Sequence, residues 1–167
     1  QVIQPIALQS GAEFADPNSY QSRALARTEE QVGINDQTPA KIIQYYALYS
    51  IFMATNGVSN IITDSEGILD VPGWIVPTGW ESNTIDPCSG GWFGVDCDGD
   101  QVTRLDLFSN LLTGAFPPEV TLLASDGPRA TGAGALQRVD LFDNQLLTNN
   151  GDNTWWSDLG SAFGKYF

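Results

Sequence analysis

Two cysteines, Cys88 and Cys97, are the residues of this chain whose type and spacing most directly indicate a chemistry. A zinc site would need two more soft ligands, and the sequence contains no histidine and no third cysteine. A local disulfide is therefore the favoured interpretation, and it implies an oxidising compartment. Two free thiols in a reducing compartment are the alternative.

Acidic side chains dominate the charge of the chain. Its 167 residues include 20 acidic and 7 basic side chains, which gives a net charge of −13. Proteins that bind nucleic acid or an anionic membrane surface need a basic face, which seven scattered bases cannot make. Without histidine, Ser-His-Asp and Cys-His catalysis are excluded, and no pair of carboxylates has a diagnostic spacing. We expect no enzymatic activity and no cofactor.

The acidic segment 96–100 (DCDGD) resembles a calcium-binding loop only in part. An EF-hand loop needs glycine at its sixth position and glutamate at its twelfth, but Gly99 is the fourth residue and Leu107 is the twelfth. We therefore predict a solvated turn and no metal site. Asp98-Gly99, between Val95 and Val102, predicts a β-hairpin here.

Two helices are predicted ahead of these residues, in a helical leader at 18–57. The first begins after the segment 16–19 (DPNS) and ends at Gly33. The second has Thr38 as its N-cap and Pro39 at its first helical position. Because this second segment is apolar nearly all round, we expect it to be buried.

The rest of the N-terminal half is less regular. Residues 1–17 show no period and are predicted to form an extended arm. Residues 58–87 are rich in loop-forming residues. The longest apolar run, at 45–55, is too short to span a bilayer, so we expect no transmembrane segment.

An internal repeat is the most informative pattern in the sequence. Segments 102–112 and 136–146 both match L-x-x-L-x-L-x-x-N-x-L, which predicts a short strand with its leucines facing inward. The asparagine would bond backbone groups that the following bend leaves unpaired. The repeat positions are Leu105, Leu107, Asn110 and Leu112 in the first copy, and Val139, Leu141, Asn144 and Leu146 in the second.

This pattern resembles the leucine-rich repeat, and the continuation TGAFPPEV at 113–120 resembles the plant-type form of that family. The resemblance implies an α/β fold that is the start of a leucine-rich repeat solenoid, with about two repeats and short parallel strands at 102–167. The plant-type period is about 24 residues, whereas the two copies are offset by 34. We therefore expect insertions near 124–135 and 147–154.

Upstream segments resemble other parts of the same family. Residues 87–97 resemble the PC-x-W-x-G-V-x-C signature of the plant-type N-terminal cap, which would occupy 58–101 with its hairpin pinned by the disulfide. The leader segments DPNSYQSRAL and IIQYYALYSIFMATNG resemble those of receptor-like or secreted leucine-rich repeat proteins of diatoms and related algae. The family binds partners on its concave strand face.

Strand alternation places the same three residue types outward in both repeats. We predict that they form a partner-binding face composed of Arg104, Asp106 and Phe108 with Arg138, Asp140 and Phe142. In the alternative interpretation, the arginine and aspartate rows neutralise each other while the phenylalanines pack as a wall or lie beneath an insertion.

The favoured function is a non-catalytic module, secreted or on the extracellular face of a membrane, that binds a protein or peptide. Tryptophans that stack on sugars would be a sub-case, and the residues considered are Trp74, Trp80, Trp92, Trp155 and Trp156. For Trp92, a place in the core of the cap is the favoured interpretation. The alternative is a structural accessory subunit, for instance in an organelle lumen, that docks on neighbouring subunits through residues 1–17 and an open C-terminal edge. Because two repeats bury little core, we expect either further repeats or a partner on that edge.

Overall fold

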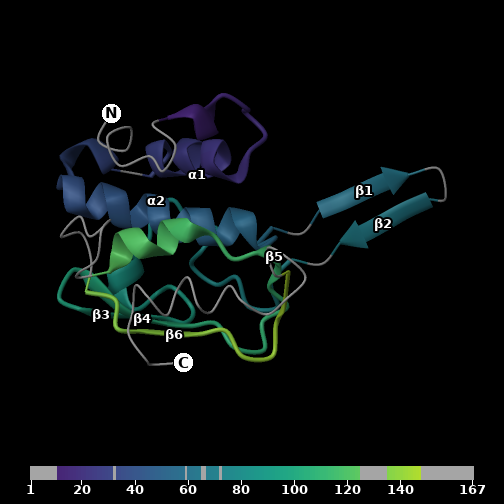
Figure 1. Cartoon of the computed structure of the whole chain (residues 1–167). Helices are drawn as coiled ribbons and strands as arrows, with labels where there is room; N and C mark the ends of the chain where they lie inside the picture. The colour runs from purple at the N-terminus through teal and green to yellow at the C-terminus, as the bar shows by residue number, and fades with distance from the viewer. Residues whose placement is uncertain are drawn as a thin grey trace.

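The computed structural model describes residues 11–31, 33–58, 60–64, 67–71, 73–124 and 135–147. Its fold is a mixture of helices and short strands (Figure 1). Helix α1 (Tyr20–Glu29) packs on the longer helix α2 (Pro39–Ala54), and α2 packs in turn on the second half of the chain. Helix α2 therefore lies between α1 and the parallel strands.

Both helices begin where the sequence predicts. The Ser19 hydroxyl accepts the Ser22 N–H at 3.1 Å, and the Thr38 hydroxyl accepts the Lys41 N–H at 3.3 Å. These bonds satisfy backbone donors that the first helical turn leaves unpaired. The first helix ends earlier than predicted, at Glu29 rather than Gly33. Gly33 instead takes a left-handed conformation before the 3₁₀ helix η3 (Ile34–Asp36).

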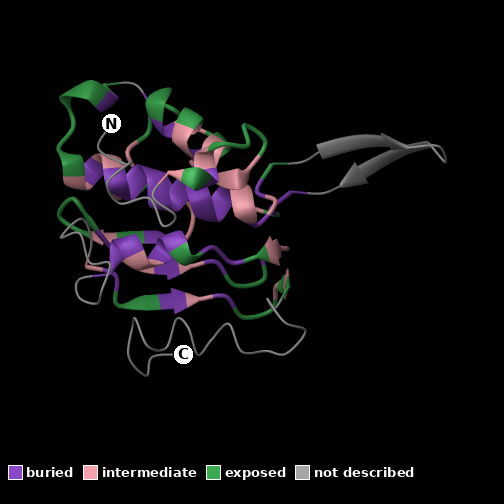
Figure 2. Ribbon diagram, turned by 45° about the horizontal axis from the view of Figure 1, so that its top comes forward, coloured by how far each residue is buried: buried purple, intermediate pink, exposed green. Residues whose placement is uncertain are grey.

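The predicted burial of α2 is confirmed. Its side chains are buried around most of the helix, as the purple ribbon in Figure 2 shows. Phe52 packs edge-on against Trp74 with ring centroids 5.0 Å apart, and Tyr49 lies 5.3 Å from Trp92. Aromatic pairs at these distances add to the free energy gained from burial.

The prediction of an extended arm over 1–17 is wrong for residues 11–17. A 3₁₀ helix, η2 (Ala12–Phe14), forms there, and its Phe14 ring meets Tyr46 of α2 edge-on, with centroids 6.1 Å apart. The segment coils because docking Phe14 on α2 buries aromatic surface, which a local sequence pattern does not reveal. Residues 1–10 lie outside the described part of the chain.

A β-hairpin that the sequence did not predict follows α2. Strands β1 (Asn60–Asp64) and β2 (Gly67–Val71) pair antiparallel, from Asn60 opposite Val71 to Asp64 opposite Gly67. The hairpin extends away from the rest of the fold (Figure 1). The sequence carries a signal for it, the turn-forming segment DSEG between two short apolar runs, but runs this short make the signal weak.

The hairpin predicted at Asp98-Gly99, which is the second along the chain, and the predicted disulfide are both confirmed. Strands β3 (Val95–Asp98) and β4 (Gln101–Asp106) pair antiparallel around Gly99, which takes a left-handed φ of 57°. Cys97 of β3 is bonded to Cys88 in the 3₁₀ helix η4 (Pro87–Ser89), with the two Cα atoms 5.4 Å apart.

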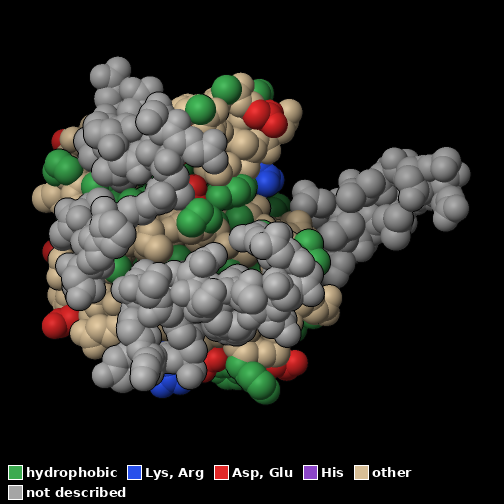
Figure 3. All heavy atoms as spheres, viewed as in Figure 1, with side chains coloured by type: hydrophobic (Ala, Val, Ile, Leu, Met, Phe, Trp, Pro, Cys, Tyr) green, Lys and Arg blue, Asp and Glu red, His purple; other side chains and the backbone are tan. Residues whose placement is uncertain are grey.

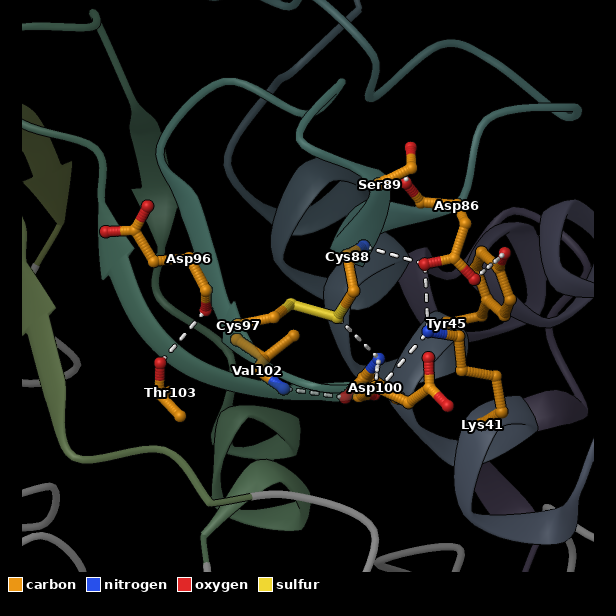
Figure 4. Close-up of a disulfide and its surroundings, with 11 residues drawn as sticks. Lys41, Tyr45, Asp86, Cys88, Ser89, Asp96, Cys97, Asp100, Val102 and Thr103 are labelled. Atoms are coloured by element: carbon orange, nitrogen blue, oxygen red, sulfur yellow. Dashed lines mark hydrogen bonds and ion pairs between the residues drawn. A yellow bond between two sulfur atoms is a disulfide. The ribbon is translucent and has the colours of Figure 1, made fainter.

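Polar bonds attach this disulfide-linked hairpin to α2 (Figure 4). The Asp86 carboxylate accepts bonds from Lys41 Nζ at 2.9 Å and from the Tyr45 hydroxyl at 3.3 Å. On the hairpin itself, the Gln44 amide oxygen accepts the Val102 N–H at 2.9 Å. Burial, together with the nearby Asp86 carboxylate, holds the pKa of Tyr45 well above its usual range, so the hydroxyl remains a donor.

The predicted parallel pairing of the two repeats is confirmed. Strand β6 (Arg138–Asp140) pairs with β4, with Leu105 opposite Val139, and β7 (Gln145–Leu147) pairs with β5 (Thr113–Ala115). The 3₁₀ helix η5 (Pro118–Leu123) connects the two layers on the side of α2. In the described part of the chain, these are short parallel strands in small sheets that do not form a closed solenoid.

The two predicted insertions are described only at their edges. Residues 125–134 lie outside the described part of the chain, but Ala124 and Leu136 on either side of them form a parallel bridge. The two ends of this insertion therefore lie next to each other. Of the insertion near 147–154, only Leu147 is described.

The match between Leu112 and Leu146 is not kept in three dimensions. Leu146 lies opposite Gly114, so the offset between the copies falls from 34 residues at the first strand pair to 32 at the second. The first copy bends through two left-handed residues, Ser109 and Leu111, whereas the second bends through Asp143 alone. Leu112 is fully buried, and Leu146 is partly buried.

The repeat asparagines bond the backbone as predicted. Buried Asn110 accepts the Val76 N–H on its amide oxygen at 2.7 Å. Asn144, 34 residues further along, makes the same kind of contact in the second repeat. Its amide oxygen accepts the N–H groups of Asn110 at 3.1 Å and Leu112 at 2.9 Å. The segment 74–76 thus lies next to the first repeat, in the way that the first repeat lies next to the second, although it does not match the repeat motif.

The amide nitrogen of Asn144 also bonds three carbonyl groups. It donates to the backbone oxygens of Leu107, Leu141 and Phe142 at 2.8, 3.0 and 3.3 Å. One side chain therefore bonds five backbone groups in two successive bends.

Intact mass will test the disulfide in solution. We expect no uptake of alkyl groups by the native protein before reduction and uptake of two afterwards, because both thiols are bonded. The Cys88→Ala/Cys97→Ala variant should lose roughly 2 to 3 kcal/mol of unfolding free energy, since a short closed loop gains modest closure entropy. Alkylation of the unreduced protein would contradict the structure.

The asparagine contacts predict a large effect for Asn144→Ala. We expect this change to cost about 2 to 4 kcal/mol of unfolding free energy, because it leaves backbone groups in two bends without partners. Urea denaturation followed by tryptophan fluorescence will measure it. Asn35→Ala is the matched control: Asn35 is exposed, and its loss should change stability by less than ~0.5 kcal/mol. Equal costs for the two variants would contradict the role of Asn144.

Candidate functional site

The residues predicted to bind a partner are brought together by the parallel pairing of β4 and β6. Arg104 lies opposite Arg138, and Asp106 lies opposite Asp140. Equivalent side chains of adjacent strands are separated by the strand spacing of about 4.8 Å. The structure therefore contains the predicted arginine row and aspartate row.

Each arginine is paired with the aspartate of its own strand. Arg104 Nη2 contacts Asp106 Oδ2, and Arg138 Nη2 lies 3.2 Å from Asp140 Oδ2. Arg104 Nε also lies 4.0 Å from Asp96 Oδ2 on β3. The two rows neutralise each other, as one of the sequence-based alternatives proposed. Such part-exposed pairs contribute about 0–1 kcal/mol each to stability, so their main effect is to orient the side chains.

The two phenylalanines stand just past the ends of these strands and are largely exposed. Phe108 exposes 50% of its surface and Phe142 exposes 77%. The insertion near 124–135, beneath which the rings lie in the alternative interpretation, falls outside the described part of the chain from 125 to 134. Hydrophobic side chains flanked by acidic ones are visible at the lower edge of the molecule in Figure 3.

The backbone that carries the two rings is held by hydrogen bonds. The Phe142 carbonyl accepts the Ser109 N–H at 2.9 Å, and the Phe142 N–H donates to Asp140 Oδ1 at 3.2 Å. The Ser109 hydroxyl donates to Asp143 Oδ2 at 2.7 Å. Both rings are therefore attached to bends of fixed geometry, which lowers the entropy cost of using them in a contact.

Inward residues of the same strands form the core of this part of the fold. Leu105 and Leu107 are fully buried, and Val139 and Leu141 expose only 4%. A bulge in β4 sets this arrangement: Val102 pairs with Cys97 and Arg104 with Asp96, so Thr103 is an extra residue. The bulge allows Val102 and Leu105 to face inward although they are three residues apart.

The suggestion that tryptophans stack on sugars is wrong for Trp74 and Trp80, whereas Trp92 lies in the core, as the sequence favoured. Trp74, Trp80 and Trp92 expose 5% or less of their surface and pack together in the core. Their indole N–H groups donate to Thr55, Phe93 and Ile85 respectively. Trp155 and Trp156 lie outside the described residues.

Sequence reasoning missed two acidic residues at this face. Asp96 reaches Arg104 from β3, and Asp143 joins the two bends through Ser109. The pairing of Ser109 with Asp143 could have been inferred from the sequence, because the two residues occupy the same repeat position, 34 residues apart. The contact of Asp96 was not, because it depends on the bulge in β4.

Within the described ranges, no group of three or more acidic, cysteine or histidine side chains is arranged to hold a metal ion. In the same part of the chain, no helix has the length and apolarity needed to cross a membrane. Comparison with protein-family models, curated proteins and solved structures returns no match for this chain.

The opposite environments of adjacent residues on the first strand predict opposite mutational effects. Leu107→Ala should cost about 2 to 5 kcal/mol of unfolding free energy, because it leaves a cavity in the core. Phe108→Ala, the matched control one residue further on, should cost less than about 1 kcal/mol, because half of the ring is already in water. Denaturant unfolding will measure both. A cost below ~0.5 kcal/mol for Leu107→Ala would show that the two faces of the strand are assigned the wrong way round.

Proposed function

We propose that this chain is a non-catalytic interaction module that binds a protein or peptide on the outward face of β4 and β6. The observation that supports this most directly is the exposure of Phe108 and Phe142, at 50% and 77%, at equivalent positions of two adjacent strand layers. Repeat architecture constrains the inward residues, whereas the outward ones are free to vary. Two large apolar rings in water at the same position favour a partner that covers them.

The composition of this face suits a binding hot spot. Aromatic rings beside arginines are over-represented among the residues that dominate binding energy. Each arginine is oriented by its own aspartate, and Asp96 and Asp143 add two further acids, so a partner would meet an acidic polar region next to the rings. Because these ion pairs are internal to the face, the rings would provide most of the affinity and the polar groups would provide register.

We further propose that the module is of the leucine-rich repeat type. Parallel strand pairs and the asparagine contacts that repeat from Asn110 to Asn144 support this architecture. The disulfide-linked hairpin would belong to its N-terminal cap at 58–101, and α2 to the helical leader that precedes the cap. A disulfide is compatible with a secreted protein or the extracellular side of a membrane, which is the location we propose.

Affinity measurements on a double variant test the binding face. Linear peptides selected from a random displayed library against the wild-type protein provide the probe. We expect Phe108→Ala/Phe142→Ala to weaken binding of the selected peptides by at least ~30-fold, or about 2 kcal/mol, because both anchor rings are lost. Circular dichroism and thermal melting will verify that the variant is folded.

Val58→Ala/Ile85→Ala is the matched control, since each of these side chains is 38% exposed elsewhere on the molecule. It should leave binding within ~3-fold of wild type. Full affinity of the Phe108→Ala/Phe142→Ala variant would contradict the proposal and move the site to the C-terminal segment around Trp155 and Trp156.

A structural accessory subunit, such as one in an organelle lumen, is the second candidate. One observation favours it: hairpin β1–β2 extends from the fold and, among the described strands, pairs only with itself (Figure 1). Edge strands of such a hairpin offer backbone groups to a neighbouring subunit. Of residues 1–17, through which this alternative docks, 11–17 pack near α2 through Phe14, and 1–10 lie outside the described part of the chain, as does the segment after Leu147.

A further inference from the structure

A glutamate is buried where the helices meet the repeats. Glu119, in η5, is 0% exposed. The hydroxyl of Tyr20, the first residue of α1, donates to its Oε2 atom at 2.9 Å. Among the described residues, its other oxygen, Oε1, has no hydrogen-bond partner. This carboxyl group therefore joins two elements that are far apart in the sequence.

The groups that face Glu119 include a second acid. Glu13 of η2 exposes only 8% of its surface, and its charge acts on Glu119. From the helices, Tyr20 and Gln21 of α1 provide polar side chains, and Tyr46 of α2 lies close enough for Glu119 to influence its hydroxyl. Tyr46 Oη is also buried without a hydrogen-bond partner in the described residues.

Basic side chains of the described ranges are engaged at other places. Lys41 pairs with Asp86, Arg27 with Glu30, and Arg23 donates to the Met53 carbonyl. Arg104 and Arg138 pair with the aspartates of the strand face. None of these contacts provides a counter-charge for Glu119, and an ionised carboxylate without one is costly to bury.

We propose that Glu119 is a proton-dependent latch, which holds η2 and α1 against η5 when its carboxyl group is protonated and loosens that contact when it ionises. Both elements depend on the same contact, because the Ser19 hydroxyl at the start of α1 donates to the Glu13 carbonyl at 2.9 Å. The latch is separate from the strand face and does not depend on the proposed binding function.

The direction of the pH effect follows from the environment of Glu119. Burial, and then the charge of Glu13, raise its pKa above the ordinary value of 4.5, while its own backbone, the hydrogen bond from Tyr20 and the nearby Gln21 oppose the rise. A raised folded-state pKa means that folding favours the neutral form. Its stabilising contribution is complete below the unfolded-state pKa and is lost as the pH rises through the folded-state pKa.

Hydrogen exchange of the full chain tests the latch. We expect protection of the α1 amides in the wild type, corrected for intrinsic exchange, to fall about tenfold or more between about pH 5 and about pH 8. In Glu119→Gln, which keeps an oxygen acceptor for Tyr20 and cannot ionise, protection should change by less than ~2-fold and exceed the wild type at the higher pH.

Glu29→Gln is the matched control, because it removes the same charge from an exposed position on α1. It should keep the pH dependence of the wild type. The proposal is overturned if Glu119→Gln does so too. Should that variant not fold, titration of the Glu119 side-chain carbon by NMR in the wild type decides: a midpoint above 4.5 supports the latch, and one at or below 4.5 overturns it.

Discussion

Helix α2 has to be covered on nearly every side, and the other elements are arranged to do so. Its side chains are apolar almost all round, so each face left in water would lose hydrophobic free energy. Helix α1 covers one side, the tryptophan cluster covers another, and η5 and β4 cover the rest. The C-terminal end of α2 also serves as a layer of the strand stack, because the Thr55 carbonyl accepts the Thr113 N–H at 3.2 Å.

Interior hydrogen bonds also determine the geometry of the outward face. Asn144 bonds Leu107 and Leu141 from inside the bend, and the same amide nitrogen reaches the Phe142 carbonyl. The position of the exposed Phe142 ring is therefore set by a side chain whose contacts satisfy the backbone. The β4 bulge has a similar double effect, since it directs Leu105 inward and brings Arg104 within reach of Asp96.

Polar groups are concentrated at the joints between elements rather than in the middle of the core. Gln44 and Lys41 attach the disulfide-linked hairpin to α2, and the hydroxyl of Tyr20 attaches α1 to Glu119. A chain with a net charge of −13 has few cations for its buried acids. The joint at Lys41 uses one of them, whereas the joint at Glu119 uses none of the described ones, which makes the latter sensitive to protonation.

Local patterns in the sequence determined the helix starts at Ser19 and Thr38, the hairpin at Gly99, the parallel strand pair and the outward phenylalanines. Caps, turns and side-chain periods act over a few residues, so they can be read without knowing the fold. Only the tertiary structure decided that Trp74 and Trp80 are core, that Leu146 lies opposite Gly114, that residues 12–14 coil against Tyr46 and that Glu119 is buried beside Tyr20. These outcomes depend on which surfaces meet across tens of residues, and a tryptophan or glutamate has the same local pattern whether or not another element comes to cover it.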